Sequence, residues 1–349
     1  MNLTERTTEK DRPETPGTPK RMLARLGRIP TPLIFVICIV VAGALLWWQG
    51  SIRDIVDAIG EADVSRLLIA APIYVASVWL LCLRWHILVR MAQGWSDLPR
   101  ASEAFLTSVV INYAAPVGLA VPSRAALTKR ALGLDHGATG TIALWEIGAD
   151  VVVLGAGSLL WLLMADGSTS AVGDELSNSA GQYIKWGGLG IVVVLLGLAW
   201  FLRTSEKRRK FVRLAQKILL APKERPMEAL LVLVVSLVYW IVQGIVLAIL
   251  VHAMHVETSF EFILGLTSVP ILIGMLSPIP GGAVVREALM YVVARLADVP
   301  TGPVVAAAVI YRIALFGAIP ILYVITRWWI SRRKHGHPNL PGHESAGVT

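Results

Sequence analysis

The sequence predicts an all-α, polytopic membrane protein with about six full spans and two re-entrant helical hairpins in inverted repeats. Of the 349 residues, 55% are hydrophobic and only 16% are charged, a composition that excludes a soluble domain. Several apolar runs exceed the roughly 18 residues that a membrane-spanning helix needs. Two further apolar segments are interrupted by proline, glycine and charge, which favours helices that enter the bilayer and turn back inside protein.

The chain divides into one transmembrane domain between two polar tails. Residues 1–30 are polar and proline-containing, and we expect a disordered cytoplasmic tail there. We expect the transmembrane domain over residues 31–330 and a second disordered cytoplasmic tail over 331–349. A first span is predicted at 32–48. It is long enough to remain as an anchor, so we expect no cleavable signal peptide.

The first predicted repeat, repeat A, covers about residues 67–164. It consists of a span at 67–88, a hairpin at 101–132 and a long helix at 137–164. Arg84 lies near the end of the first of these, where its long side chain is expected to snorkel toward the interface. Pro116 and Pro122 interrupt the hairpin, because proline cannot continue a regular helix without losing a hydrogen bond.

A linker at about 183–223 follows, and then repeat B at about 227–329. The linker holds a span at 183–202 and an amphipathic helix over 207–218, which opens with four basic residues and suits an anionic lipid surface. Repeat B has a span at 226–254, a second hairpin at 259–297 and a last span at 301–329.

The second hairpin contains the strongest helix-breaking signal of the chain, the stretch from Ser277 to Glu287. Two prolines and a Gly-Gly pair within it exclude a continuous helix. In each hairpin an arginine follows a proline by eight residues: Arg124 follows Pro116, and Arg286 follows Pro278. Broken helices in matching halves of a membrane protein are typical of a transporter's binding site.

The distribution of lysine and arginine predicts the orientation. With both termini in the cytoplasm, the basic segments fall inside and the two acidic loops fall outside, in agreement with the positive-inside rule. The first hairpin then enters from the cytoplasm and the second from the opposite side. The two repeats are therefore expected to be inverted, as in alternating-access carriers.

Several ionisable residues fall inside predicted spans, where each costs about 2.5–3.5 kcal/mol unless it is paired or hydrated. Glu146 and Asp150 are four residues apart and share one helix face. One interpretation is a cavity in which arginines hold an anionic headgroup, because guanidinium matches phosphate in a bidentate way. The other is a structural salt bridge that ties the two repeats together. The predicted substrate-binding residues are Asn112, Arg124, Glu146, Asp150, Pro280, Gly281, Gly282, Arg286, Glu287 and Arg312.

We expect neither a catalytic site nor a bound cofactor. His252 and His255 lie three residues apart without a third ligand nearby, so no metal site is expected. No Walker A loop and no hydrolase motif occurs, which argues against an ATPase of its own and against an enzyme. The formal charge of +8 indicates contact with the membrane surface rather than with nucleic acid, because the basic residues flank apolar runs.

Several of these residues resemble a known family, the transmembrane region of lysylphosphatidylglycerol synthases. The resemblance covers about residues 67–329. It is carried by Arg84-Trp85, by Asn112 with Pro116 and Arg124, by Glu146 and Asp150, by the stretch from Pro278 to Glu287, and by Tyr311-Arg312. It implies a flippase-like membrane domain that stands alone, without the soluble domain that makes the aminoacyl lipid.

The resemblance implies movement of an anionic phospholipid or of a lipid-linked headgroup such as a polyprenyl phosphate. The expected location is the cytoplasmic membrane of a prokaryote, and the expected partners are a membrane lipid and either a separate lipid-modifying enzyme or a second copy of the chain. Three alternatives remain open: a secondary transporter for a small soluble anion, a membrane-embedded transferase that uses Glu146 and Asp150 as acid and base, and a non-transporting accessory subunit.

Overall fold

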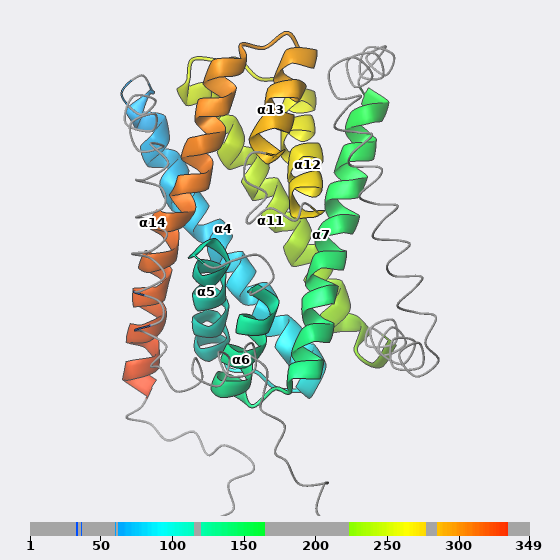
Figure 1. Cartoon of the computed structure of the whole chain (residues 1–349), viewed down its shortest axis with the longest axis vertical. Helices are drawn as coiled ribbons and strands as arrows, with labels where there is room; N and C mark the ends of the chain where they lie inside the picture. The colour runs from blue at the N-terminus through cyan, green and yellow to red at the C-terminus, as the bar shows by residue number, and fades with distance from the viewer. Residues whose placement is uncertain are drawn as a thin grey trace, which may run out of the picture.

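The computed structural model describes residues 62–114, 120–164, 223–276 and 285–333, together with residues 33, 36 and 60. All regular secondary structure in the four long ranges is helical (Figure 1), which confirms the predicted all-α class. The helices of these ranges are α4 (Val64–Gln93), α5 (Leu98–Ala114), α6 (Ala120–Leu132), α7 (His136–Met164), α11 (Pro226–Ala253), α12 (Phe260–Leu276), α13 (Val285–Leu296) and α14 (Thr301–Arg333).

Four of these helices, α4, α7, α11 and α14, are long and apolar enough to cross a membrane. They match the spans predicted at 67–88, 137–164, 226–254 and 301–329. Large apolar side chains such as Leu68, Leu163 and Val324 are exposed along them, as expected for contact with lipid. The spans predicted at 32–48 and 183–202, the interfacial helix, the amino-terminal tail and residues 334–349 lie outside the described residues, apart from residues 33 and 36. Residues 331–333 were predicted as the start of the disordered tail, but they belong to α14, because the helix continues beyond its apolar part.

Helices α4 and α11 form a long antiparallel pair that is tied at both ends. At the start of α4, the backbone N–H of Asp63 donates to Ala253 O at 2.8 Å, and Arg66 Nη1 donates to His252 O at 2.7 Å. At the other end, Arg225 Nη1 donates to Arg90 O at 3.1 Å. These contacts fix the register of the two helices, because each joins the first turn of one to the last turn of the other.

Both ends of α4 carry the expected caps. The Asp63 carboxylate accepts from the hydroxyl of Ser65 at 2.6 Å and from its backbone N–H at 3.0 Å. The hydroxyl contact, followed by the backbone contacts, holds the pKa of Asp63 below its ordinary value. Gly94 ends the helix with φ at 88°, a left-handed conformation that favours glycine.

Two pairs of short helices complete the described bundle, and each pair coincides with one predicted hairpin. Helices α5 and α12 have 17 residues each, and α6 and α13 have 13 and 12. At 1.5 Å per residue even the longer ones reach only about 26 Å, less than the roughly 30 Å of a bilayer core. Their turns, residues 115–119 and 277–284, lie outside the described residues.

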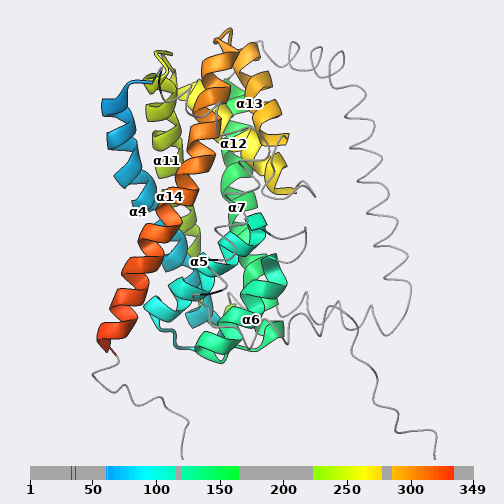
Figure 2. The ribbon, with the colours of Figure 1, turned by 60° about the vertical axis from the view of Figure 1, so that its left-hand side comes forward.

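The two short pairs lie at opposite ends of the bundle. In Figure 1, α5 and α6 occupy the lower end and α12 and α13 the upper end, and Figure 2 shows the same separation from a second direction. Each pair starts and finishes at its own end, and the end of its first helix and the start of its second helix lie toward the middle of the bundle. The described residues of the two predicted hairpins therefore form two short helix pairs.

Helix α7 approaches α12 closely because small residues lie at the contact. A Cβ atom at Gly265 would overlap the indole of Trp161, and one at Gly157 would lie 3.2 Å from the Cβ of Ser268. Glycine at 265 is therefore required by the close approach of two helices rather than by backbone conformation. This contact holds the upper short pair against a long helix.

The lower end of the bundle is rich in basic residues, and ion pairs join α5 to α14 there. Arg327 Nη1 lies 3.0 Å from Glu103 Oε1, and Arg333 Nη1 lies 3.3 Å from Asp97 Oδ2. The hydroxyl of Tyr323 also contacts Glu103 Oε1, at 3.4 Å. These contacts fasten the lower short pair to the last helix.

Candidate functional site

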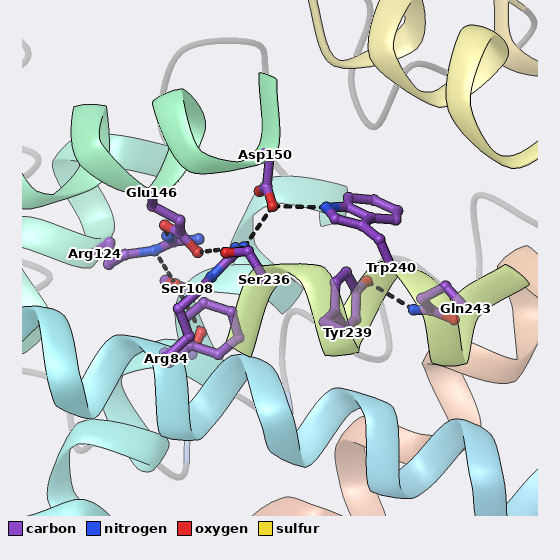
Figure 3. A network of polar contacts seen from close by, with 10 residues as sticks. Arg84, Ser108, Arg124, Glu146, Asp150, Ser236, Tyr239, Trp240 and Gln243 are labelled. Carbon is purple, nitrogen blue, oxygen red and sulfur yellow. Dashed lines mark hydrogen bonds and ion pairs between the residues drawn. The ribbon is translucent and has the colours of Figure 1, made fainter. Parts of the chain in front are cut away.

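Arg84 lies at the centre of a buried polar network that joins five helices (Figure 3). Its Nη1 donates to Asp150 Oδ1 at 2.5 Å and to Ser236 Oγ at 3.0 Å. Its Nη2 donates to Glu146 Oε1 at 2.8 Å. One guanidinium group on α4 therefore holds two carboxylates on α7 and a hydroxyl on α11.

The expectation that Arg84 snorkels to the interface is wrong. Its side chain is only 3% exposed, and α4 continues for nine residues beyond it, to Gln93. Trp85 and Leu88 beside it are fully buried, so this part of α4 faces the interior of the bundle. Arg84 was not among the predicted binding residues. It contacts the helix face that Glu146 and Asp150 were predicted to share.

Arg124 brings the lower short pair into the same network. From the second turn of α6, its Nη1 forms an ion pair with Glu146 Oε2, and its Nε donates to Ser108 Oγ on α5 at 2.9 Å. Its guanidinium group lies 4.9 Å from the ring centre of Trp85 and 4.7 Å from that of Phe105. Aromatic rings beside a cation stabilise its charge where water is scarce. Arg124, which follows the first interruption, is therefore held against α7.

Helix α11 supplies the hydrogen bonds on the remaining side. Trp240 Nε1 donates to Asp150 Oδ1 at 2.8 Å, and the buried Gln243 donates to the hydroxyl of Tyr239 at 2.7 Å. None of these α11 residues was among the predicted binding residues. The sequence does contain a pattern that indicates them. Ser236, Tyr239 and Gln243 are spaced by three and four residues in an otherwise apolar helix, and this spacing predicts a polar strip on one helix face.

The network is balanced in charge. Arg84 and Arg124 oppose Glu146 and Asp150, and the side chains are between 3% and 16% exposed. Both oxygens of Glu146 contact an arginine, and Oδ1 of Asp150 contacts an arginine and an indole. Buried charges are tolerated when they are paired and hydrogen-bonded in this way. All of its ion pairs lie within predicted repeat A, and only hydrogen bonds reach α11.

A second cluster lies beside the second interruption. In the first turn of α13, Glu287 Oε1 lies 3.2 Å from Arg312 Nη1 of α14. The guanidinium group of Arg286 lies 4.6 Å from the ring centre of Tyr311, which is buried. The Tyr311 ring in turn meets Tyr74 of α4 edge-on, with ring centres 5.4 Å apart. Arg312 therefore pairs within predicted repeat B rather than with Glu146 or Asp150.

The predicted binding residues thus form two groups rather than one. Arg124, Glu146 and Asp150 meet around Arg84, whereas Arg286, Glu287 and Arg312 meet around Tyr311. Tyr74 and Arg84 mark the two groups on α4, and their separation of ten residues corresponds to about 15 Å along a helix.

Four of the predicted residues cannot be assigned to either group. Pro280, Gly281 and Gly282 lie outside the described residues, and Asn112 is described only as part of the backbone of α5. Among the described residues, no three His, Cys, Asp or Glu side chains form a group suited to a metal ion. His252 Nδ1 instead lies 2.9 Å from Ala248 O and 3.1 Å from Thr258 Oγ1.

Comparison with known protein families gives a match over most of the chain. The family described as Lysylphosphatidylglycerol synthase TM region matches residues 35–322, which is most of the chain. The match includes both short helix pairs and both charged clusters. None of the curated proteins matches the chain.

Proposed function

The chain belongs to the family of the lysylphosphatidylglycerol synthase transmembrane region, and from this premise we propose that it moves a lipid across the cytoplasmic membrane without an ATPase of its own. The substrate would be an anionic phospholipid or a lipid-linked headgroup such as a polyprenyl phosphate. The protein would transport this lipid without altering it chemically.

The proposal rests on one observation: two interrupted helix pairs lie at opposite ends of the bundle (Figure 1). We propose that they are re-entrant hairpins of two inverted repeats, one open to each leaflet. An arginine lies in the first two turns after each interruption: Arg124 in α6 and Arg286 in α13. Such an arrangement offers a polar path from either side of the membrane toward a shared middle, as alternating access requires.

Two features support a lipid over the alternatives. A cavity of about 240 Å³ between α4, α11 and α14 is lined almost entirely by apolar side chains, including Leu67, Val246 and Ile313. An acyl chain suits such a lining, whereas a small soluble anion does not. The transferase alternative requires a carboxylate available as a base, but Glu146 has both oxygens occupied by arginines.

The proposed orientation follows from charge. The lower end of Figure 1 holds the ends of α4, α6 and α14 and the start of α11. Basic residues lie at these helix ends, among them Arg90, Lys129 and Arg225, so we propose that this end faces the cytoplasm. The carboxyl-terminal tail then lies inside. The amino-terminal tail also lies inside if the span predicted at 32–48 precedes α4, which starts at the opposite end.

Reconstitution of the purified full chain into liposomes tests the proposal. Vesicles would carry a fluorescent phosphatidylglycerol, phosphatidylethanolamine or phosphatidylcholine, and an impermeant reductant would bleach the label in the outer leaflet only. We expect faster loss of the inner-leaflet label with the anionic lipid than in protein-free vesicles. Heat-denatured protein is the control, and release of a trapped soluble anion tests the main alternative. Unchanged rates for every lipid with folded protein would refute the proposal.

A further inference from the structure

The two charged clusters differ in how completely their polar atoms are bonded. In the network around Arg84, each carboxylate receives at least two contacts from arginine or indole groups, and the buried Nε of Arg84 has no hydrogen-bond partner among the described residues. In the second cluster, Arg312 and Glu287 share a single contact at 3.2 Å. The Nε of Arg312 and the Oε2 of Glu287 are shielded from solvent, yet neither has a hydrogen-bond partner among the described residues.

An ion pair with unbonded, solvent-shielded polar atoms can gain hydrogen bonds from a ligand. A buried donor or acceptor that loses water without a replacement is unfavourable, and the cost is larger for charged groups. Arg312 Nε needs an acceptor and Glu287 Oε2 needs a donor, so the complementary ligand must offer both. The network around Arg84 has much less to gain from a ligand, because an incoming anion would have to displace a carboxylate there.

We infer that Arg312 and Glu287, with Arg286 beside them, bind a phosphodiester headgroup that carries a hydroxyl or ammonium donor. The phosphate accepts from Arg312 Nε, and the hydroxyl or ammonium group donates to Glu287 Oε2. The three side chains carry a formal charge of +1, which suits the single negative charge of a phosphodiester. This inference rests on the proposed function and deepens it, because it assigns the headgroup to one of the two clusters.

The surroundings favour a lipid over free phosphate. Arg286 lies on the ring of Tyr311, Tyr311 meets Tyr74, and Tyr74 lines the apolar cavity between α4, α11 and α14. Two aromatic rings thus separate the charged cluster from a space that suits an acyl chain. Free phosphate would gain nothing from this neighbourhood, since it has no apolar part to bury.

Equilibrium binding to the purified full chain in detergent tests the inference independently of transport. The probes are a short-chain phosphatidylglycerol, a phosphatidylmethanol with the same chains, and inorganic phosphate. Phosphatidylmethanol keeps the phosphodiester but has no donor. We expect wild-type protein to bind phosphatidylglycerol about ten- to a hundredfold more tightly than phosphatidylmethanol, the range for a hydrogen bond to a charged group. We expect inorganic phosphate to bind more weakly than either lipid.

Variants assign the two contacts. Arg312→Gln should weaken phosphatidylglycerol binding by about ten- to a hundredfold, and Glu287→Gln should reduce the advantage over phosphatidylmethanol. Arg312→Lys keeps the charge but lacks the Nε donor, so it should also weaken binding, and it serves if the glutamine variant does not fold. Arg295→Gln removes a charge at the exposed end of the same helix, α13, and should bind like wild type.

The possible failures can be told apart. Wild-type protein that binds phosphatidylmethanol as tightly as phosphatidylglycerol would overturn the assignment of Glu287, and this measurement needs no variant. Equal binding of inorganic phosphate would overturn a headgroup site. Lipid transport with phosphatidylglycerol binding unaffected by Arg312→Gln would overturn this inference alone. Normal binding without transport of any lipid would overturn the proposed function alone.

Discussion

Replacement of Arg84 by methionine should be among the most destabilising single changes in the described part of the chain. Arg84 makes hydrogen bonds of 2.5, 2.8 and 3.0 Å to Asp150, Glu146 and Ser236. Methionine would fill a similar volume but leave Glu146 Oε1 without a partner and Asp150 with only the Trp240 indole. Breaking a buried ion pair by removing one partner costs about 3–5 kcal/mol, because the other charge stays buried.

That cost corresponds to a loss of roughly 6–20 °C in unfolding midpoint, at about 2–4 °C for each kcal/mol. The midpoint can be followed in detergent by the fraction of protein that still elutes as a single species after heating. Arg90→Gln on the same helix is the matched control. Arg90 is 40% exposed and lies 3.7 Å from Glu228, so its loss should cost no more than about 1 kcal/mol.

A combined variant separates charge from packing. Arg84→Met together with Glu146→Gln and Asp150→Asn removes one positive and two negative charges, and it should recover a large part of the lost stability. Arg124 then remains as a partly buried cation beside two aromatic rings, so recovery should be incomplete. If Arg84→Met unfolds at the wild-type midpoint, or if the combined variant is no more stable than the single one, the network does not stabilise the bundle as argued.

Three further predictions concern packing, capping and orientation. Gly265→Ala should lower the unfolding midpoint, with a cost of about 1–3 kcal/mol, because its methyl group meets Trp161, whereas Gly155→Ala on α7 meets nothing within 4 Å and should be tolerated. Asp63→Ala should lower the unfolding midpoint at neutral pH, and the difference from wild type should shrink as the pH falls through the lowered pKa of Asp63, where wild type loses the charged cap. A cysteine at Ser345, in a chain without the two native cysteines, should resist an impermeant thiol reagent in intact cells; efficient labelling would reverse the proposed orientation.

The helices were predictable where one physical signal dominates. Pro226 opens α11 at the position expected for a proline in a first turn, and long apolar runs located the four described spans. The two short helix pairs coincide with the segments in which clustered prolines and glycines predicted hairpins. Single prolines were not a reliable signal, because Pro72 and Pro320 lie inside continuous helices. A membrane helix tolerates proline when neighbouring groups satisfy the freed backbone carbonyl.

The candidate site was predictable only in part, because partner choice is a property of three-dimensional packing. The spacing of Glu146 and Asp150 located one face of one helix but did not identify the cation that it meets. Arg84 seemed to be near a helix end because the polar residues after it lower the local hydropathy, while α4 in fact runs on to Gln93. Trp240 gave no signal at all, since an indole in a span is ordinarily read as an interface anchor.

The carboxylates of the Arg84 network receive more contacts than Glu287 does, and this difference bears on how a lipid carrier with these two clusters would work. A headgroup that crosses the bilayer needs a site that binds it weakly enough to release it, and an existing ion pair lowers affinity because the ligand must share its arginine. In the proposed headgroup site Glu287 would have this effect, since its one contact at 3.2 Å leaves Arg312 only partly engaged. At the first interruption, Arg124 is fixed by Glu146, Ser108 and two aromatic rings. The asymmetry therefore favours one exchangeable site, supported by a second cluster that stays rigid while the first fills and empties.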